Sequence, residues 1–467
     1  MLALKVAPNV FDISSQLVHV SMRDQVVRAR LLVRDLKLSK LKCDRILIVG
    51  AGIAGISAAA AAAAQGVEAL VVDTNSEPMA LQGSVTSRWV GPFMYEWPLV
   101  HSGNQDYPPN HPSFWDVPDR DTPSWSQTDP VPSSVLSGDV RTWLTKYLGG
   151  VWKSPRKRPR FLMSVNGSQV SHYVKKVFTP GGTNAATFIG TSWPLGGPSA
   201  VAFEPDYILL AAGMGREDVE LTKGGFSGVP FWSNDDLKDT VVQRQRMAVF
   251  GGGDGALQDV FRALTSFDHP LSLMKQLQVG ASGQALQQLI PGLTVIEGQS
   301  RLLGTWTARK DQWKVLDTKC AEFAKTFSKD ADAVAKVAAA IRPGAGQIHL
   351  FVRGEGFSKA YLLNRFVIYL IEHAMLASPH QFAGKMALKI VRNVTAVQST
   401  PMTANGIRFR TRPTKGSGVL RTHRFDRVVV RFGIVEGTIP GLQMVSLTAS
   451  PPEHRTTLAQ VPLPFVV

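Results

Sequence analysis

The chain has 467 residues, too many for one ordinary hydrophobic core, and we therefore expect at least two domains. Its mean hydropathy is near zero and no apolar run reaches the roughly 18 residues of a membrane span, so we expect no transmembrane segment. The low number of cysteines and the lack of a recognisable secretory signal favour a cytoplasmic protein. The formal net charge of +15 favours anionic ligands. Only two cysteines, Cys43 and Cys320, are present, which excludes a disulfide framework, a CxxC redox pair and a cysteine-based zinc site.

Residues 1–42 precede the first clear motif and form a predicted N-terminal extension. The segment VVRARLLVRDLKLSKLK, residues 26–42, mixes apolar and basic positions and fits either a strand or an amphipathic helix. Its role stays open between an added strand on the first domain and a dimer contact.

Residues 44–75 predict a strand, a tight glycine turn, a small-residue helix and a second strand. DRILIVG and VEALVVD are short apolar runs, and IAGISAAAAAAAQG between them is a helix that stops at Gly66. In GAGIAG the first glycine permits the turn, the second lets a pyrophosphate approach the backbone, and the third lets the helix pack on the strand. An acid after the second strand can accept hydrogen bonds from ribose. The predicted dinucleotide contacts are Gly50, Ala51, Gly52, Ile53, Ala54, Gly55 and Asp73.

Residues 82–160 are crowded with prolines and with six tryptophans between Trp89 and Trp152. We expect little regular structure but an ordered excursion that covers a site. Within SRWVGPFMYEWP, the side chains of Arg88, Trp89, Tyr95 and Trp97 either line a cofactor or substrate pocket or simply pack.

Other polar residues of this excursion give no recognisable site. His101, His111, Glu96 and Asp106 have no triad or metal-ligand spacing, so the catalytic residues are unknown and no metal is expected. The basic stretch KSPRKRPR, residues 153–160, is typical of a solvated loop, because no binding fold or stacking aromatics accompany it. We therefore expect nucleic acid not to be a partner.

The strand–glycine–helix pattern recurs further along the chain. EPDYILLAAGMG, residues 204–215, predicts a buried strand that ends in small residues. QRMAVFGGGDGALQDVFRAL, residues 245–264, predicts a second dinucleotide unit, with Asp254 capping the helix or contacting a ribose or nicotinamide. Glu297 lies too far away to be its ribose-reading acid, while Arg301 would favour a 2′-phosphate, so NAD and NADP stay alternatives. The turn could also be purely structural.

A mostly helical region follows to residue 342, and then strands HLFVRG, MALKIVRNVTAVQS, GIRFRTRP and FDRVVVRFG with a helix at KAYLLNRFVIYLIEHA. The predicted fold class is α/β, with two Rossmann-like βαβ units and an irregular Pro/Trp-rich excursion. The predicted domains are a first one at 43–235 with an insertion at 82–160, a second one at 236–440 with a helical insertion at 256–342, and a tail at 441–467.

The order GAGIAG, Asp73, ILLAAGMG and GGGDGA resembles the two-dinucleotide-binding-domain flavoproteins, a superfamily of FAD/NAD(P)-binding oxidoreductases. That group includes pyridine-nucleotide reductases of the thioredoxin-reductase type and flavin-containing monooxygenases. The resemblance covers the glycine elements between residues 44 and 265. It implies FAD at the first motif and NAD(P)H at the second, held by Gly50, Gly52, Gly55, Asp73, Arg88, Ala212 and Gly213 and by Gly251, Gly253, Asp254 and Gly255, respectively.

The chain departs from this family in three places. It has no CxxC, so it cannot be a dithiol–disulfide reductase of that type. It has no clear G-D element for the flavin ribityl chain, although FDRVVVRFGIVEG, residues 425–437, lies where such an element would fall. The FWS of residues 231–233 is similar to an aromatic–His–Ser segment of the monooxygenases but lacks its histidine.

The sequence therefore predicts an FAD-dependent oxidoreductase that passes hydride from NAD(P)H through the flavin to a small molecule or to oxygen, with monooxygenase-like chemistry as one form. Two alternatives stay open. One is an FAD-dependent oxidase or dehydrogenase whose second glycine turn is structural. The other is a non-catalytic nucleotide-binding module that uses its positive charge to recruit an acidic partner.

Overall fold

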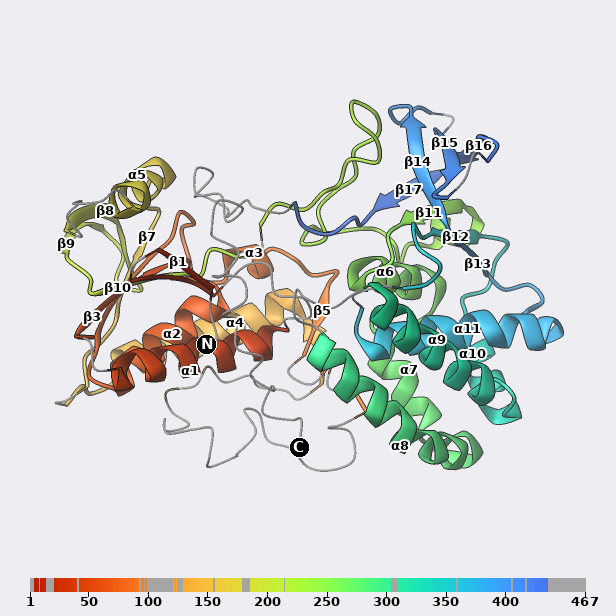
Figure 1. Cartoon of the computed structure of the whole chain (residues 1–467), viewed down its shortest axis with the longest axis horizontal. Coiled ribbons are helices and arrows are strands. Elements are labelled where there is room, and N and C mark those ends of the chain that lie inside the picture. Colours follow the sequence, from red (N-terminus) through yellow and green to blue (C-terminus); the bar gives the residue numbers. More distant parts are fainter. Residues whose placement is uncertain are drawn as a thin grey trace.

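The computed structural model describes residues 4–7, 9–13, 21–39, 42–91, 94–95, 97–98, 121, 123, 129–153, 156–178, 185–213, 215–303, 310–357, 360–404, 406–415 and 418–435. These residues form two α/β units that lie side by side (Figure 1). The first unit is built on an eight-stranded sheet and the second on a four-stranded sheet. The expected α/β class is thereby confirmed.

The first sheet has a parallel centre of four strands in the order β7-β4-β3-β10. Both faces of its inner strands are buried, which explains the unbroken apolar runs of the sequence. An antiparallel hairpin of β8 and β9 extends the sheet beyond β7, and α5 (Gly167–Phe178) precedes that hairpin. The bounds are β3 (Arg45–Val49), β4 (Glu68–Val72), β7 (Arg160–Met163), β8 (Ala186–Trp193), β9 (Pro198–Phe203) and β10 (Tyr207–Leu210).

The N-terminal extension belongs to this first unit. β1 (Leu4–Ala7) and β2 (Val10–Asp12) form a hairpin, and β2 pairs in parallel with β10. The ambiguous basic segment is a helix, α1 (Met22–Leu38), because Val26, Ala29 and Val33 recur at helical spacing and are buried. It packs on α2 (Ile53–Ala64), so the extension is an addition to the first unit.

The Pro/Trp-rich excursion contains more regular structure than we expected. α3 (Ala80–Gly83), β5 (Trp89–Val90) and β6 (Val131–Pro132) are short, but α4 (Ser133–Gly149) is a helix of 17 residues between β4 and β7. Its buried side chains, Leu136, Val140, Leu144 and Leu148, are spaced four residues apart. That helical period was present in the sequence, and the prolines before and after it obscured it.

The second sheet repeats the order of the first, as β13-β12-β11-β17, all parallel. The apolar run that we considered for a flavin contact contributes β17 to this sheet, directly beside β11. Its apolar residues are those of a central strand in the second unit. The bounds are β11 (Arg246–Phe250), β12 (Gln347–Phe351), β13 (Ala387–Val391) and β17 (Arg427–Val430).

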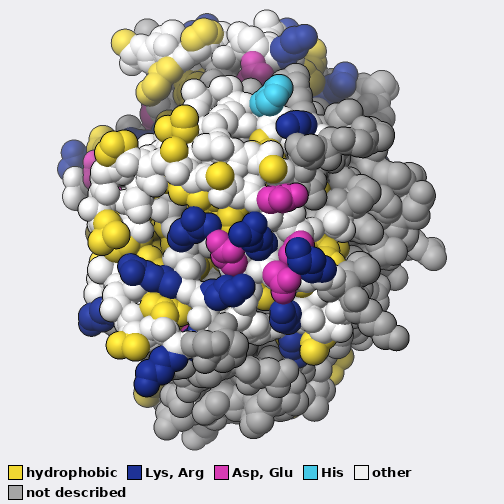
Figure 2. Space-filling model, turned by 90° about the vertical axis from the view of Figure 1, so that its left-hand side faces the viewer, with side chains coloured by type: hydrophobic (Ala, Val, Ile, Leu, Met, Phe, Trp, Pro, Cys, Tyr) yellow, Lys and Arg dark blue, Asp and Glu magenta, His cyan; other side chains and the backbone are white. Residues whose placement is uncertain are grey.

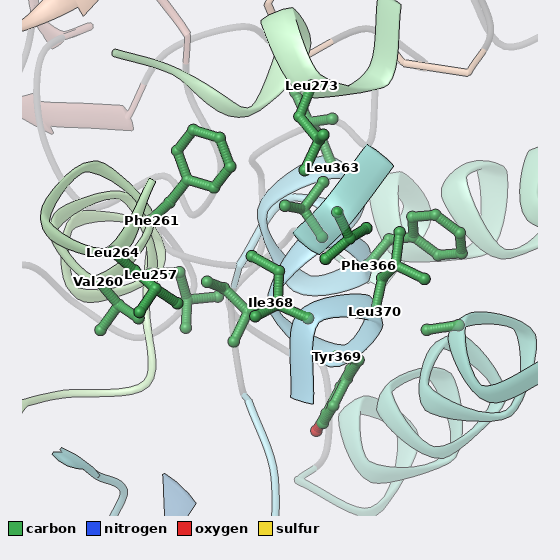
Figure 3. Close-up of a cluster of buried hydrophobic side chains, with 14 of the residues drawn as sticks. Leu257, Val260, Phe261, Leu264, Leu273, Leu363, Phe366, Ile368, Tyr369 and Leu370 are labelled. Atoms are coloured by element: carbon green, nitrogen blue, oxygen red, sulfur yellow. The ribbon is translucent and has the colours of Figure 1, made fainter. Parts of the chain in front are cut away.

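Helices cover the second sheet, and α6 and α11 form the centre of its core (Figure 3). Leu257 and Val260 of α6 and Leu363 and Phe366 of α11 belong to this cluster. A three-stranded antiparallel sheet, β14-β15-β16, packs on the face of the four-stranded sheet that is turned away from this helical core (Figure 1). The bounds are η2 (Thr240–Arg244), α6 (Asp254–Leu264), α7 (Pro270–Leu277), α8 (Gly280–Leu303), α9 (Lys310–Phe327), α10 (Ala331–Ala340), α11 (Leu362–Ala377), η3 (Pro379–Phe382), β14 (Val394–Ser399), β15 (Ile407–Pro413) and β16 (Arg421–Phe425).

The two cysteines lie in different hydrophobic cores. Cys43 is buried in the first unit and Cys320 in the second, and both are free thiols. No helix within the described ranges is long and apolar enough to cross a bilayer.

Candidate functional site

The first glycine turn joins β3 to α2 at the carboxyl end of the first sheet. Gly50 has φ = +110°, and a Cβ added there would lie 2.3 Å from the carbonyl oxygen of Ala211. A Cβ on Gly55 would lie 1.9 Å from the carbonyl oxygen of Gly50. A Cβ on Gly52 would meet no heavy atom within 4 Å. The outer glycines therefore close the turn, and the middle one leaves open space at the N-terminus of α2.

Asp73 follows β4 and lies beside this turn. One carboxylate oxygen accepts a hydrogen bond from the backbone N–H of Ala51 at 2.6 Å. The other accepts from the backbone and the side chain of Asn75, each at 2.8 Å. A carboxylate has about four acceptor positions, so about one stays available to a ribose hydroxyl. The predicted acid is thus in place, and it also fixes the conformation of the turn.

The small residues after β10 reach the same edge of the sheet. Ala211 donates its N–H to the carbonyl of Val49 at 2.7 Å and approaches Gly50 closely. Gly213 has φ = +87° and open space around its α-carbon. Strand β10 therefore brings Ala212 and Gly213 to the side of the first glycine turn, as the sequence predicted.

The second turn, between β11 and α6, has the same geometry. Gly251 has φ = +137°, and a Cβ there would lie 2.2 Å from the carbonyl oxygen of Arg431, at the end of β17. A Cβ on Gly253 would meet nothing within 4 Å, and Ala256 is fully buried where the first turn has its third glycine. Gly255 faces Phe231. In each unit, the residue after the neighbouring strand, β10 in the first and β17 in the second, packs against the first glycine of the turn. The middle glycine of each turn faces open space.

Asp254, at the start of α6, also contacts α11. Its Oδ1 accepts hydrogen bonds from the backbone N–H of Tyr361 at 2.8 Å and from the side chain of Asn364 at 2.7 Å. The N-cap residue of α6 is Gly253. Asp254 thus joins the glycine turn to the start of α11.

The strand register shows which residue of the second unit corresponds to Asp73. Val49 pairs with Val72, so Asp73 follows at the level of Gly50; Phe250 pairs with Phe351, so Val352 occupies the corresponding place. The next residue, Arg353, is exposed and has no partner among the described residues. Glu297 and Arg301, which we had considered, both lie in α8, because the helical insertion separates α6 from β12.

A buried cluster of charged side chains connects the two units. Arg88 of the excursion donates to Asp259 of α6, and its second terminal nitrogen lies 3.0 Å from Asp235. Arg262 binds Asp235 through both terminal nitrogens, at 2.9 and 3.0 Å, and Arg431 donates to Asp259 at 2.8 Å. Each of these side chains is at most 8% exposed.

The charges of this cluster stabilise one another. Burial opposes the ionised form of Asp259, but Arg88 and Arg431 hold its pKa below the ordinary value. Burial likewise opposes charged Arg88, but Asp259 and Asp235 raise its pKa. Arg88 also donates to the carbonyl of Phe231 and lies over its ring, with the guanidinium carbon 4.1 Å from the ring centroid. The geometry therefore favours a packing role between the units for Arg88 over the expected cofactor contact.

The neighbouring aromatic residues also pack against the second unit. Trp97 is fully buried and lies 5.1 Å from the ring of Phe366, within the core of that unit. Tyr95 stacks on Tyr361 at 4.1 Å. Trp89 lies beside His269, with ring centroids 5.8 Å apart. Of the two interpretations given for these residues, the structure favours packing.

The remaining candidate groups of the chain give no further site among the described residues. His101, His111, Glu96 and Asp106 fall outside the described residues. Within the described ranges, no group of three His, Cys, Asp or Glu side chains could hold a metal ion. A cavity of about 560 Å³ lies at the opposite, amino-terminal edge of the first sheet, with Lys42, Arg45 and Asp206 in its lining. It is remote from both turns, so we do not place the dinucleotide chemistry there.

The comparisons with known proteins agree with this geometry in the first unit. Residues 48–110 match a family model described as an NAD(P)-binding Rossmann-like domain. This range contains the first glycine turn and Asp73, so the expected Rossmann-like unit is confirmed. No curated protein matches the sequence.

Solved structures with a distant likeness to the chain include a bacillithiol disulfide reductase from Staphylococcus aureus, with 11% identity, 84% of this chain and 77% of that chain covered, and a TM-score of 0.37. A thioredoxin reductase from Lactococcus lactis has 11% identity, coverages of 85% and 78%, and a TM-score of 0.35. One from T. acidophilum has 10% identity, coverages of 84% and 78%, and a TM-score of 0.33. These scores are low, and the fold assignment rests on the chain's own topology.

Proposed function

We propose that this protein is an FAD-dependent oxidoreductase that takes its electrons from NADPH. The observation that carries the proposal is the pair of glycine turns, each at the carboxyl end of a parallel sheet with the same strand order. Ligands of open α/β sheets bind at this edge. Two such turns in one chain are what an enzyme needs to bring two dinucleotides together.

The residues of the first turn fit FAD. The open space at Gly52 admits a pyrophosphate to the N-terminus of α2, where unpaired N–H groups and the helix dipole favour negative charge. Asp73 keeps acceptor capacity for a ribose hydroxyl, and Gly213 leaves space on the other side of the turn. When bound, the flavin would accept a hydride from the reduced nicotinamide and pass the electrons on.

The residues of the second turn fit NADPH better than NADH. A carboxylate at the ribose-reading position selects NADH, because it accepts hydrogen bonds from the ribose hydroxyls and repels a 2′-phosphate. Here that position is Val352, and the exposed, unpaired Arg353 follows it in the described structure. An arginine guanidinium matches a phosphate in both charge and shape. The 2′-phosphate of NADPH would lie against Arg353.

The electron acceptor is proposed to be an organic small molecule, a quinone or oxygen, with monooxygenase-like chemistry as one form. Burial raises the pKa of the Cys43 thiol to about 11 and raises that of Cys320 as well, so both are protonated at neutral pH. Neither thiol supplies the thiolate that disulfide reduction requires. The substrate itself and the acid or base that serves it are not assigned.

The test is the visible absorption spectrum of the purified protein under anaerobic conditions. We expect flavin bands that bleach on addition of NADPH and much less readily with NADH. Bands that no nicotinamide nucleotide bleaches would instead favour the oxidase or dehydrogenase alternative with a structural second turn. A protein without flavin bands, even after reconstitution with FAD, would contradict the flavoenzyme proposal and favour the interaction module.

A further inference from the structure

The small sheet β14-β15-β16 carries an unusual concentration of positive charge. Residues 394–425 contain no Asp or Glu, although the chain as a whole has 36 acidic residues against 51 Lys and Arg. The cations of this stretch are Arg408, Arg410, Arg412, Lys415, Arg421 and Arg424. These three strands and their connections therefore carry six positive charges and no compensating acid of their own.

The pleat of β15 separates its residues onto two faces. Ile407, Phe409 and Thr411 are buried, and the ring of Phe409 packs 5.0 Å from Phe250 and 5.4 Å from Phe351. The alternate residues, all arginines, are exposed. Successive side chains on one face of a strand are about 6.8 Å apart, so the outer face presents a regular row of guanidinium groups. These exposed residues are Arg408, Arg410 and Arg412.

The neighbouring strands do not neutralise this row. Arg408 lies directly opposite Arg424 in the register of β15 and β16, an arrangement of like charges that destabilises a sheet. Arg410 lies opposite Thr422, and Arg412 opposite Thr395 of β14. Within the described part of the chain, the three β15 arginines have no ion-pair or hydrogen-bond partner for their side chains. Folding alone does not account for this repulsion.

Basic side chains elsewhere on the surface are arranged differently. On the face of the first unit in Figure 2, Lys and Arg side chains lie among Asp and Glu. At the amino-terminal edge of the first sheet, Glu68 pairs with both Arg45, at 3.1 Å, and Arg160, at 2.7 Å. Lys42 pairs with Asp206 at 3.3 Å. These basic side chains are thus paired with carboxylates, whereas none of the three β15 arginines has a carboxylate partner among the described residues.

We propose that the outer face of β14-β15-β16 binds the phosphate backbone of a nucleic acid without reading its bases. Arginine forks match phosphate oxygens, and a row of evenly spaced cations suits a polymer with evenly spaced anions better than the irregular carboxylates of an acidic protein. The hydroxyls of Thr395 and Thr422 lie on the same face and add neutral donors of the kind that contact phosphates.

The aromatic residues of this sheet exclude a stacking mode. Phe409 and Phe425 are buried, with ring centroids 5.4 Å apart, on the face that packs against the second unit. Exposed aromatic rings that could stack on bases are therefore missing from these three strands. Binding should be electrostatic, independent of sequence and strongly dependent on salt. The three arginines alternate along β15, and the pleat of that strand places them on one face.

The test measures binding of the full-length protein to fluorescein-labelled single-stranded and duplex oligonucleotides by fluorescence anisotropy over a series of salt concentrations. The variant is the triple substitution Arg408→Gln, Arg410→Gln and Arg412→Gln. The control triple removes the same charge from exposed positions of the first unit, as Lys153→Gln, Lys157→Gln and Arg158→Gln. Circular dichroism and the melting temperature establish that each variant is folded, and the flavin absorbance is recorded in parallel.

We expect the wild type to bind at low salt, with an affinity whose logarithm falls linearly with the logarithm of the salt concentration. The β15 triple should reduce the slope of that line by about 2 to 3, roughly 0.7 to 0.9 for each lost phosphate contact, while the control triple leaves it nearly unchanged. Equal losses in both triples would show attraction by net charge alone and would overturn the proposal. So would a wild type that binds phosphatidylserine vesicles or polyglutamate but neither oligonucleotide.

Discussion

Replacing Gly52 with serine separates the role of this residue in folding from its role in cofactor binding. Gly52 is the N-cap of α2, with φ = −75° and ψ = −177°, a conformation that any residue adopts. An added Cβ meets no heavy atom within 4 Å. Serine and glycine differ at an N-cap by only a few tenths of a kcal/mol, so the stability of the apo protein should change by less than about 0.5 kcal/mol.

FAD binding by this variant should fall substantially. The added hydroxymethyl group enters the space through which the pyrophosphate approaches the N–H groups of α2. Loss of one hydrogen bond to a charged group costs about 1.5 to 3 kcal/mol, which corresponds to roughly 10- to 150-fold weaker binding. The assay titrates FAD into the apo protein and follows the quenching of flavin fluorescence, with thermal unfolding of the apo variant measured alongside.

Two matched substitutions sharpen this experiment. Gly253→Ser makes the same change at the open glycine of the second turn, and we expect it to keep its flavin but to need more NADPH for bleaching. Gly50→Ala places a Cβ 2.3 Å from the carbonyl oxygen of Ala211 at φ = +110°, which should cost about 3 kcal/mol or more of stability. A Gly52→Ser protein that binds FAD with wild-type affinity would refute the assignment of this turn.

Three further predictions follow from the geometry. Arg353→Gln should raise KM for NADPH roughly tenfold or more, with KM for NADH and kcat nearly unchanged in steady-state kinetics; equal effects on both nucleotides would contradict the 2′-phosphate contact. Asp259→Asn leaves two buried arginines without their carboxylate, and a denaturant titration should show the free energy of unfolding lowered by about 3 to 5 kcal/mol. The control Asp236→Asn removes a carboxylate from an exposed ion pair and should lower it by less than about 1 kcal/mol. Burial lowers the pKa of His349 to about 4, so on acidification the unfolded chain binds a proton at this residue before the folded chain does. The free energy of unfolding should therefore fall by about 1 to 2 kcal/mol between pH 6.5 and 4, after discounting for partial exposure. The free energy of unfolding of His349→Phe should fall less over this range, and an identical fall would remove His349 as the cause.

Local patterns were sufficient for much of the fold and for both glycine turns. The apolar runs before Gly50 and Gly251 predict parallel strands because such strands are buried on both faces. The three glycines of the first turn were assigned separate roles, and the added-Cβ distances at Gly50, Gly52 and Gly55 agree with each of them. These features depend on residues that are neighbours in sequence, so the sequence displays them directly.

The parts that the sequence did not predict depend on pairing between distant segments. The ribose-reading position of the second unit was sought near Glu297, because nothing in the sequence shows that β12 pairs with β11 across a long helical insertion. Likewise, the apolar pattern of β17 does not show which sheet it joins. Arg88 could not be assigned to its buried cluster, because Asp235, Asp259 and Arg431 lie far away in the sequence and meet only in the folded chain.

The position of Trp97 has a consequence for how the chain can be divided. The indole belongs by sequence to the first unit but fills the core of the second, next to Phe366, together with Met94. A fragment that begins at the linker before β11 would lack both side chains, and an empty site of indole size costs about 3 to 5 kcal/mol, a large share of the stability of an ordinary domain. We therefore expect the second unit to depend on a segment of the first for part of its stability. A chimaera or truncated variant built on the second unit should therefore retain the segment with Met94 and Trp97. With that segment, we expect it to unfold in one cooperative transition.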